Sequence, residues 1–208
     1  MAIKTMTDSG RIFKNPWLEA LTRTHIAIPL CIFFGTGGLA LCWSVIGLDL
    51  GALESISFFF IGLVFFTLVE YTVHRYCYHM GTGSPRRARL QYALHGVHHE
   101  HPRDKRRLSL PPVASIIVAA VFLGLFRLVL GLHGYAFGGG FLTAYALYLL
   151  IHYSIHALSP PKNFLRVLWK HHHLHHFVGD TAAFGVSSPL WDHVFGTMPT
   201  DPRLKKEA

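Results

Sequence analysis

Sixteen histidines stand out in this chain of 208 residues, and most of them fall into short clusters. The densest cluster lies in Leu168–His176, with the sequence LWKHHHLHH. In a helix, His172, His175 and His176 share one face, because residues three and four apart are neighbours there. Imidazole is a versatile metal ligand, so three rings on one face indicate half of a metal site. Taken alone, the stretch is equally compatible with a surface histidine run that scavenges metal.

Seven more histidines form three further clusters along the chain. They are His74 and His79, then His95, His98 and His99, and finally His152 and His156. The second and third of these clusters have helical spacing, so the rings of each share a helical face. His74 and His79 are about 140° apart round an ideal helix, and we therefore expect that helix to end or bulge between them.

Ten clustered imidazoles are too many for one metal ion, which takes about four to six ligands. They suit two metals, with five positions each or with fewer and water completing the shell. We therefore predict a multi-histidine site for two metal ions. Its predicted ligands are His74, His79, His95, His98, His99, His152, His156, His172, His175 and His176.

Two acidic residues stand close to these clusters. Glu70 precedes His74 by one helical turn and could orient that ring, but an ion pair with Arg75 fits the sequence equally well. Asp192 could support the site or cap a helix, and His193 beside it is a further supporting candidate. The other histidines are expected to stay outside the ligand set: His25, His101 and His133 as structural or surface residues, and His171 and His173 as solvated or supporting residues off the ligand face.

The composition places this site in a membrane protein. Hydrophobic residues make up 51% of the chain and charged residues only 14%, which is more apolar than ordinary soluble domains. The net charge of +8 could suggest nucleic acid, but the basic residues flank apolar stretches, so we expect no nucleic-acid binding. The three cysteines, Cys31, Cys42 and Cys77, form neither a disulfide framework nor a CxxC zinc motif.

Four apolar stretches are long enough to cross a bilayer as helices. We expect an all-α membrane protein with two helical hairpins, whose links are Gly47–Ser55 and the glycine-rich Gly131–Gly140. Polar segments at the other end would form a helical cap that carries the histidines. The predicted parts are an N-terminal segment at 1–25 and one membrane domain at 26–208, with spans at about 26–46, 56–73, 113–130 and 141–158.

The distribution of Lys and Arg predicts the orientation in the membrane. Eighteen of the nineteen basic residues precede the first span, lie between the second and third, or follow the fourth, and Arg127 is the exception. Basic residues accumulate in cytoplasmic segments, so both termini and all four histidine clusters are predicted to be cytoplasmic.

The motifs HRYCYH, HGVHH, HYSIH and HHLHH, with the closing stretch AFGVSSPLWDHVFGT, resemble the membrane-bound fatty acid hydroxylase and sterol desaturase superfamily. The resemblance covers about residues 56–197, and within the superfamily the pattern looks most like fatty acid 2-hydroxylases. It implies that the ten clustered histidines bind a dimetal centre, taken to be di-iron in the active enzyme, although zinc can occupy such sites. It also matches Tyr148 to an aromatic position that lines the site, while Leu149 stands where some relatives have a carboxylate.

The implied activity is hydroxylation of a lipid with O2 as co-substrate, at the 2-position of a fatty acyl chain. Nothing before Ile26 resembles the cytochrome b5 domain of some relatives, so a separate electron donor is implied: a cytochrome b5-like protein, a ferredoxin or a flavoprotein reductase. The expected location is the inner membrane of a bacterium or the endoplasmic reticulum of a eukaryote.

Two alternative functions remain open. A sterol or carotenoid desaturase or hydroxylase would keep the same metal chemistry. A histidine-rich metal transporter is disfavoured, because transporters hold their ligands near the bilayer midplane whereas these clusters lie at one boundary.

Overall fold

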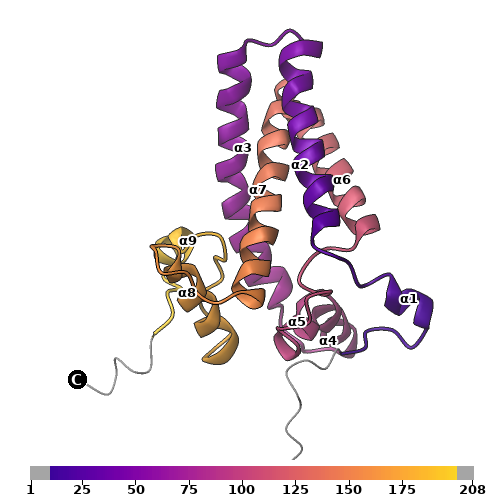
Figure 1. The fold of residues 1–208 in the computed structure, drawn as a ribbon, viewed down its shortest axis with the longest axis vertical. Helices are drawn as coiled ribbons and strands as arrows, with labels where there is room; N and C mark the ends of the chain where they lie inside the picture. Colours follow the sequence, from indigo (N-terminus) through magenta and orange to yellow (C-terminus); the bar gives the residue numbers. More distant parts are fainter. Residues whose placement is uncertain (1–9, 201–208) are drawn as a thin grey trace, which may run out of the picture. The chain divides into compact units, whose positions relative to one another are not determined.

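The computed structural model describes residues 10–200, and within that range it consists of helices and turns without a strand (Figure 1). The all-α prediction is therefore confirmed. Part of the predicted N-terminal segment, including Lys4, lies outside the described residues, as do Arg203, Lys205 and Lys206 of the basic tail.

Nine α-helices follow one another in the described part of the chain. They are α1 (Pro16–Ala20), α2 (Ala27–Cys42), α3 (Ala52–Val73), α4 (Pro85–Gln91), α5 (Val97–Glu100), α6 (Pro112–Leu130), α7 (His133–Ala157), α8 (Arg166–Phe177) and α9 (Leu190–Val194). Three π-helical turns, Trp43–Gly47, His74–Tyr78 and Tyr92–Gly96, directly follow α2, α3 and α4.

The chain forms two compact units. The membrane unit comprises Phe13–Thr67 and Lys105–Tyr153. The histidine unit comprises Leu68–Asp104 and, within the described residues, 10–12 and 154–200. Helices α3 and α7 are continuous across the division.

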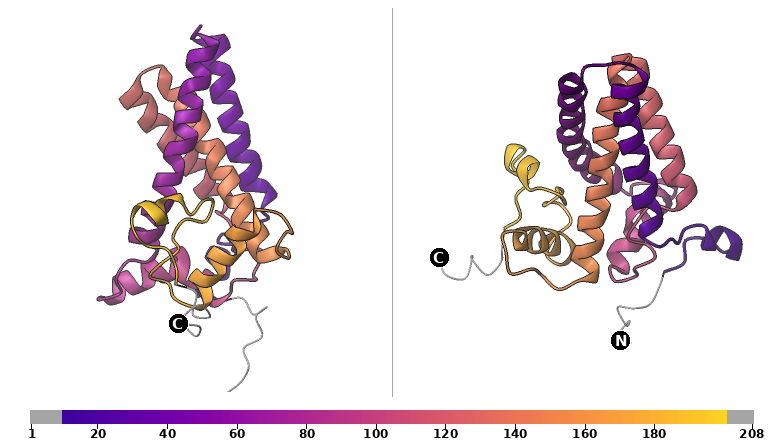
Figure 2. Two further views of the ribbon diagram at one scale, coloured as in Figure 1. Left: turned by 90° about the vertical axis from the view of Figure 1, so that its left-hand side faces the viewer. Right: turned by 45° about the horizontal axis from the view of Figure 1, so that its top comes forward.

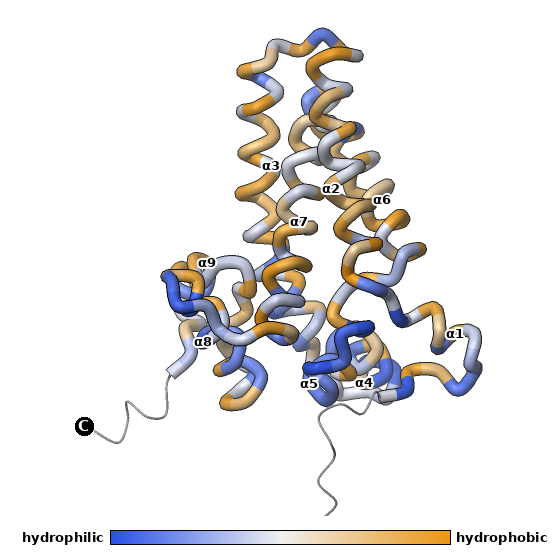
Figure 3. Tube along the Cα trace, in the orientation of Figure 1, coloured by the Kyte–Doolittle hydropathy of each residue, from blue (hydrophilic) through white to orange (hydrophobic). Residues whose placement is uncertain are grey.

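Within residues 10–200, four helices are long and apolar enough to cross a membrane, and they form the two predicted hairpins, α2–α3 and α6–α7. Within the membrane unit these helices lie side by side in all views (Figures 1 and 2), and hydrophobic residues dominate along them (Figure 3). Large apolar side chains such as Leu39 and Leu128, which are 73% and 82% exposed, point outward. Continuous apolar surface of this kind is stable in lipid and not in water. The chain is therefore an integral membrane protein.

Two of the four spans start earlier than the sequence predicts. The observed spans are Ala27–Gly47, Ala52–Tyr78, Pro112–Leu130 and His133–Ala157. The first and third agree with the predicted ranges, but the second begins four residues before 56 and the fourth eight residues before 141. The segment Gly131–Gly140 is therefore mostly helix, and its interpretation as a link is wrong.

Close packing explains why this segment is both helical and rich in glycine. A Cβ atom on Gly140 would overlap the Phe59 carbonyl of α3, and one on Gly134 would overlap the backbone of α6 at Phe126. Glycine lets membrane helices approach this closely, because no side chain separates their backbones. Helix α7 is accordingly the central one: 67% of its most apolar stretch is buried, against 17–22% for the other three spans.

A buried ion pair holds the polar end of the membrane unit together. Glu19 in α1 is only 6% exposed and pairs with the buried guanidinium of Arg107 and, at 3.3 Å, with Arg23. The amide of Thr24 donates to the carbonyl of Arg106 at 2.9 Å. The chain leading into α2 thus runs beside the chain leading into α6.

Candidate metal centre

A π-helical turn brings the first two predicted ligands together. The amide of His79 donates to the carbonyl of His74, five residues earlier, at 3.2 Å. The extra residue in this turn brings His79 back over His74, and the two ring centroids are 5.1 Å apart. The bulge predicted from the five-residue spacing is therefore confirmed. A second π turn, Tyr92–Gly96, positions His95 within the next cluster.

Five predicted ligands meet in what we call the first histidine group. Nε2 of His95 lies 3.1 Å from Nε2 of His74 and 3.0 Å from Nε2 of His99. One nitrogen of every member lies within 4.8 Å of one nitrogen of every other. The members are His74, His79, His95, His99 and His175.

The other five belong to the second histidine group. Nε2 of His172 lies 2.9 Å from that of His156 and 3.1 Å from that of His176. Nε2 of His98 lies 3.1 Å from that of His176. His152, the fifth member, precedes His156 by one turn of the continuous helix α7. The two groups adjoin, because the rings of His99 and His176 stack with their centroids 4.1 Å apart.

Neighbours in sequence divide between the two groups. His95 and His99, four residues apart, serve the first group, while His98 between them serves the second. In α8 the pair four residues apart, His172 and His176, serves the second group and His175 the first. Two helices therefore contribute rings to both groups, which places the groups next to each other.

The spacing of the nitrogens fits a metal with more than four ligands. Two nitrogens at right angles around a metal, each about 2.1 Å from it, are about 3.0 Å apart, and tetrahedral ligands are about 3.4 Å apart. The Nε2 pairs at 2.9–3.1 Å match the right-angle value. Unprotonated nitrogens repel each other at this distance, and a cation between them would remove the repulsion.

Backbone carbonyls determine which nitrogen faces the first group. Nδ1 of His74 donates to the Phe184 carbonyl at 2.6 Å, and Nδ1 of His175 donates to the Ala182 carbonyl at 2.7 Å. A neutral ring that donates from Nδ1 keeps the lone pair of Nε2 for a metal. Nε2 of His175 is buried and has no hydrogen-bond partner among residues 10–200, as expected for a metal ligand.

The ring of His152 has a comparable support. Its Nδ1 lies 3.4 Å from the carbonyl of Leu108, so a backbone oxygen faces this ring. The ring of Tyr148 is parallel to that of His152 within 4°, with centroids 5.8 Å apart. Tyr148 therefore lies beside a predicted ligand, at the aromatic position matched by the sequence.

Asp192 holds the loop that carries the Ala182 and Phe184 carbonyls. Its side chain is fully buried and accepts four hydrogen bonds, from the amides of Phe184 and Gly185, the hydroxyl of Thr197 and Nε2 of His171. Asp192 thus ties the loop at Phe184 and Gly185 to His171 of α8. His171 is buried, belongs to neither histidine group and donates to Asp192.

Glu70 binds the same loop from the other side. Its carboxylate accepts from the amides of Val186 and Ser187 at 2.7 and 2.9 Å and from the Ser187 hydroxyl. Arg75 donates instead to the hydroxyl of Tyr71 at 2.8 Å. Glu70 thus contacts the loop whose Phe184 carbonyl accepts from His74, and no ion pair between Glu70 and Arg75 is present.

Burial sets the protonation states around the first group. Desolvation lowers the pKa of His175 to about 4, so its ring is neutral at physiological pH. Desolvation also lowers the pKa of His79, partly offset by Asp180, whose carboxylate is 3.7 Å from Nδ1. Burial raises the pKa of Asp192, but its hydrogen bonds, led by that from His171, outweigh this effect and hold the pKa below its usual value.

The remaining histidines lie elsewhere. His193 is exposed, so the structure does not support a role for it in the site. His133 pairs with Glu54 at 2.7 Å where α3 and α7 begin. His25 is exposed, His101 is buried away from both groups, and His173 stacks on Phe177.

Comparison with known proteins shows where this arrangement occurs. The model of the fatty acid hydroxylase family matches residues 59–197, which include all ten histidines of the two groups. The chain belongs to the fatty acid hydroxylase family. The sequence resemblance to that family is thereby confirmed.

Relatives of this fatty acid hydroxylase family member span animals, plants and fungi. It is 39% identical over 158 residues to fatty acid 2-hydroxylase of Rattus norvegicus, covering 72% of this chain but only 42% of that protein. It is 36% identical to dihydroceramide fatty acyl 2-hydroxylase FAH2 of Arabidopsis thaliana, covering 92% of this chain and 81% of that protein. Its fold matches the visible hydroxylase domain of scs7p with a TM-score of 0.82 and 32% identity, over 90% of this chain and 71% of that one.

Sequence reasoning missed the groups that orient the ligands. Three of them are backbone carbonyls, of Leu108, Ala182 and Phe184, which carry no side-chain signature. The stretch AFGVSSPLWDHVFGT was a signal for only one of the three, since it contains Phe184 together with Ser187 and Asp192 but neither Ala182 nor Leu108.

Proposed function

We propose that this protein is an O2-dependent lipid hydroxylase that adds a hydroxyl group to the 2-position of a fatty acyl chain. The observation that carries the proposal is the pair of adjoining five-histidine groups with inward-facing nitrogens, in a chain whose relatives are named as acyl 2-hydroxylases. This chain covers only 42% of the rat relative, so we extend the activity of that relative to this chain as a proposal.

We assign one iron ion to each histidine group. The first would be held by His74, His79, His95, His99 and His175, and the second by His98, His152, His156, His172 and His176. When bound, the pair of irons supplies the activation of O2 that hydroxylation of an unactivated C–H bond requires. Zinc could fill the same groups, although five nitrogens and right-angle spacing fit it less well than iron.

The chain contributes orientation and the exclusion of water. The carbonyls of Phe184 and Ala182 hold Nε2 of His74 and His175 toward the metal position. The low pKa of His175 keeps a lone pair available at neutral pH. Burial of His172 and His175, which are 1% and 0% exposed, keeps bulk water from the reacting atoms.

The substrate and partners follow from the membrane setting. A lipid would present its acyl chain from the bilayer, and the half-buried ring of Tyr148, whose centroid is 5.8 Å from that of His152, offers apolar surface beside that ligand. We place the site on the cytoplasmic side of a bacterial inner membrane or an endoplasmic reticulum membrane, because the basic segments flank it. Electrons would come from a separate acidic carrier that meets exposed cations such as Arg86 and Arg87.

Lipid mass spectrometry of cells with and without the protein tests the activity. We expect acyl chains that gain one oxygen atom at C2, and we expect this product to vanish in His172→Ala. His173→Ala is the matched control, because it removes a neighbouring imidazole outside both groups and should retain the product. Loss of two hydrogens in place of an oxygen gain would show a desaturase, and product formation by His172→Ala would refute the assignment of the second group.

A further inference from the structure

A buried tyrosine lies in α3, three residues before the first ligand of the metal centre. Tyr71 is only 1% exposed, and its ring stacks on that of Phe195 with centroids 5.2 Å apart. Its hydroxyl has two partners, Nη1 of Arg75 at 2.8 Å and Oγ1 of Thr197 at 2.8 Å. All of these residues belong to the histidine unit. Tyr71 therefore joins α3 to the segment that follows α9, although 126 positions separate it from Thr197 in the sequence.

The donors and acceptors along this chain of hydrogen bonds have a fixed order. A guanidinium group can only donate, so Arg75 donates to the oxygen of Tyr71. The ionised carboxylate of Asp192 can only accept, so the hydroxyl of Thr197 donates to it at 2.7 Å. The proton of Tyr71 must then point to Oγ1 of Thr197. Each hydroxyl both donates and accepts, and a charged group stands at each end, which strengthens such a chain.

The backbone of Thr197 holds the most unusual residue of the loop that carries the Ala182 and Phe184 carbonyls. Its carbonyl accepts from the amide of Ala183 at 2.9 Å, and its own amide donates to the Asp192 carbonyl at 2.8 Å. Ala183 has a φ of 60°, in the left-handed region that residues other than glycine rarely adopt. A conformation of this kind persists only where surrounding contacts fix it. The hydrogen bond to Thr197 is such a contact.

Ala183 lies between the two carbonyls that orient ligands of the first histidine group. The Ala182 carbonyl accepts from His175 at 2.7 Å, and the Phe184 carbonyl accepts from His74 at 2.6 Å. A shift of the backbone at Ala183 would move both carbonyls, because they lie on either side of it. Both rings belong to the first group, so that group would lose the alignment of two ligands together.

We propose that Tyr71 is a positioning residue for the first histidine group, acting through Thr197 and Ala183 on two of its rings. The hydroxyl of Tyr71 fixes the side chain of Thr197, and the backbone of Thr197 holds the left-handed turn at Ala183. This role rests on the proposed metal centre and adds to it a residue that touches no metal. Tyr71→Phe keeps the aromatic ring and removes only the hydroxyl, so it tests the connection with little change in packing.

Iron(II) binding to the full chain in detergent tests this role. Metal-free protein is dialysed to equilibrium against iron(II) in the absence of oxygen, and the bound metal is measured by elemental analysis. In a His172→Ala background, which leaves the first group intact, Tyr71→Phe should raise the Kd about tenfold, the lower end for loss of a support behind a metal ligand. In a His175→Ala background, which leaves the second group intact, Tyr71→Phe should not change the Kd.

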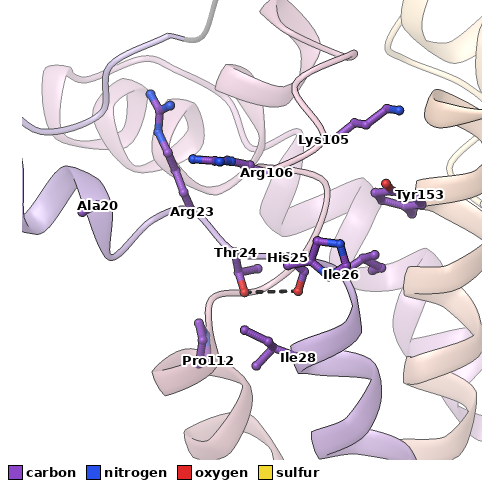
Figure 4. Close-up of a pocket in the computed structure, with 10 residues that line it drawn as sticks. All are labelled: Ala20, Arg23, Thr24, His25, Ile26, Ile28, Lys105, Arg106, Pro112 and Tyr153. Atoms are coloured by element: carbon purple, nitrogen blue, oxygen red, sulfur yellow. Dashed lines mark hydrogen bonds between the residues drawn. The ribbon is translucent and has the colours of Figure 1, made fainter.

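Two other tyrosines are matched controls for the loss of a hydroxyl. Tyr76 is 62% exposed, and its ring centroid lies 5.1 Å from the guanidinium of Arg75. Tyr153 directly follows a ligand of the second group, but its side chain lines a cavity of about 600 Å³ in the membrane unit (Figure 4). Neither hydroxyl forms a hydrogen bond with any residue in the range 10–200. Tyr76→Phe and Tyr153→Phe should therefore leave both Kd values unchanged.

Substitutions of Thr197 separate positioning from a general effect on folding. Thr197→Ser keeps the hydroxyl and should bind iron(II) tightly, whereas Thr197→Val keeps the shape, lacks the hydroxyl and should weaken the first group at least as much as Tyr71→Phe does.

Three results would overturn the role of Tyr71. They are a Kd in Tyr71→Phe equal to that in Tyr76→Phe, equal weakening of both histidine groups, and binding by Thr197→Ser as weak as that by Thr197→Val. An unaltered protein that binds no metal would refute the metal centre itself and this role with it. The readout is metal affinity, so it does not depend on which lipid reaction the protein performs.

Discussion

Replacing Asp192 by asparagine tests how the supporting loop controls one histidine group. Oδ1 accepts from the Phe184 amide at 2.9 Å and the Thr197 hydroxyl at 2.7 Å, while Oδ2 accepts from the Gly185 amide at 2.8 Å and from His171 at 3.0 Å. An asparagine amide nitrogen accepts no hydrogen bond. In either orientation of the new side chain, two of the four bonds are lost and an N–H group faces buried donors.

The lost hydrogen bonds should destabilise the loop strongly but affect only the first histidine group. Hydrogen bonds to a charged group contribute about 1.5–3 kcal/mol each, so two of them amount to about 3–6 kcal/mol of local stability. The loop carries the carbonyls that orient His74 and His175, and both rings belong to the first group. Loss of such support lowers metal affinity by about 10–100-fold. We therefore expect Asp192→Asn to lose the metal of the first group and to keep that of the second.

Elemental analysis of the purified protein measures this outcome as metal per chain. The ratio should fall from two to one in Asp192→Asn and in His172→Ala, and to zero when both are combined, because the two changes empty different groups. Glu54→Gln, which alters an exposed carboxylate of the membrane unit, should keep both metals. The reasoning is refuted if Asp192→Asn keeps both metals, or if the combined variant holds as much metal as His172→Ala alone.

Three further outcomes follow from the structure. Glu70→Gln should keep its metals, because the oxygen of the new side chain can accept from the Val186 and Ser187 amides while its N–H donates to the Ser187 hydroxyl. Glu70→Ala makes none of these bonds and should lose metal from the first group. Equal metal contents in the two variants would contradict this account. In Gly140→Ala, overlap of the new Cβ with the Phe59 carbonyl should lower the free energy of unfolding by about 1–3 kcal/mol and therefore lower the thermal unfolding temperature. Gly38→Ala should leave that temperature unchanged, because no atom lies within 4 Å of its new Cβ. In the metal-free protein, folding lowers the pKa of His175 from 6.5 to about 4, so the unfolded state binds a proton at a higher pH than the folded state does. The free energy of unfolding should therefore drop as the pH falls from 6.5 toward 4. His175→Gln should show a shallower drop in pH-dependent unfolding, and an unchanged profile would exclude His175 as the cause.

Spacing along the sequence picked out the ten histidines that the structure gathers, eight of them by helical spacing and His74 and His79 by a five-residue spacing, but it did not divide them between two groups. His98 and His99 are adjacent and serve different groups, as do His175 and His176. Residues three and four apart share a helical face, and spacing alone therefore assigns each cluster to one site. The division depends on how α5 and α8 pack against the π turn at His74–Tyr78, which is a tertiary property.

The misplaced start of the fourth span has a different physical origin. Consecutive glycines usually indicate turns, because glycine lowers helix stability in water. In a membrane the competing unfolded backbone cannot be hydrated, so helix formation is enforced and glycine serves close packing instead. The partners at Gly134 and Gly140, the backbones of α6 and α3, become visible only in three dimensions.

The π turn at His74–Tyr78 exchanges stability for function. Such a turn is less favourable than an α-helical one, and deleting a single exposed residue such as Cys77 would restore regular α-helix there. The deletion would move every later residue by about 100° round the axis, so His79 would leave the first group while the helix itself became more regular. A chain shortened in this way should form a better helix and a poorer metal site. The extra residue thus lowers the stability of this helix and positions the imidazole of His79 in the first group.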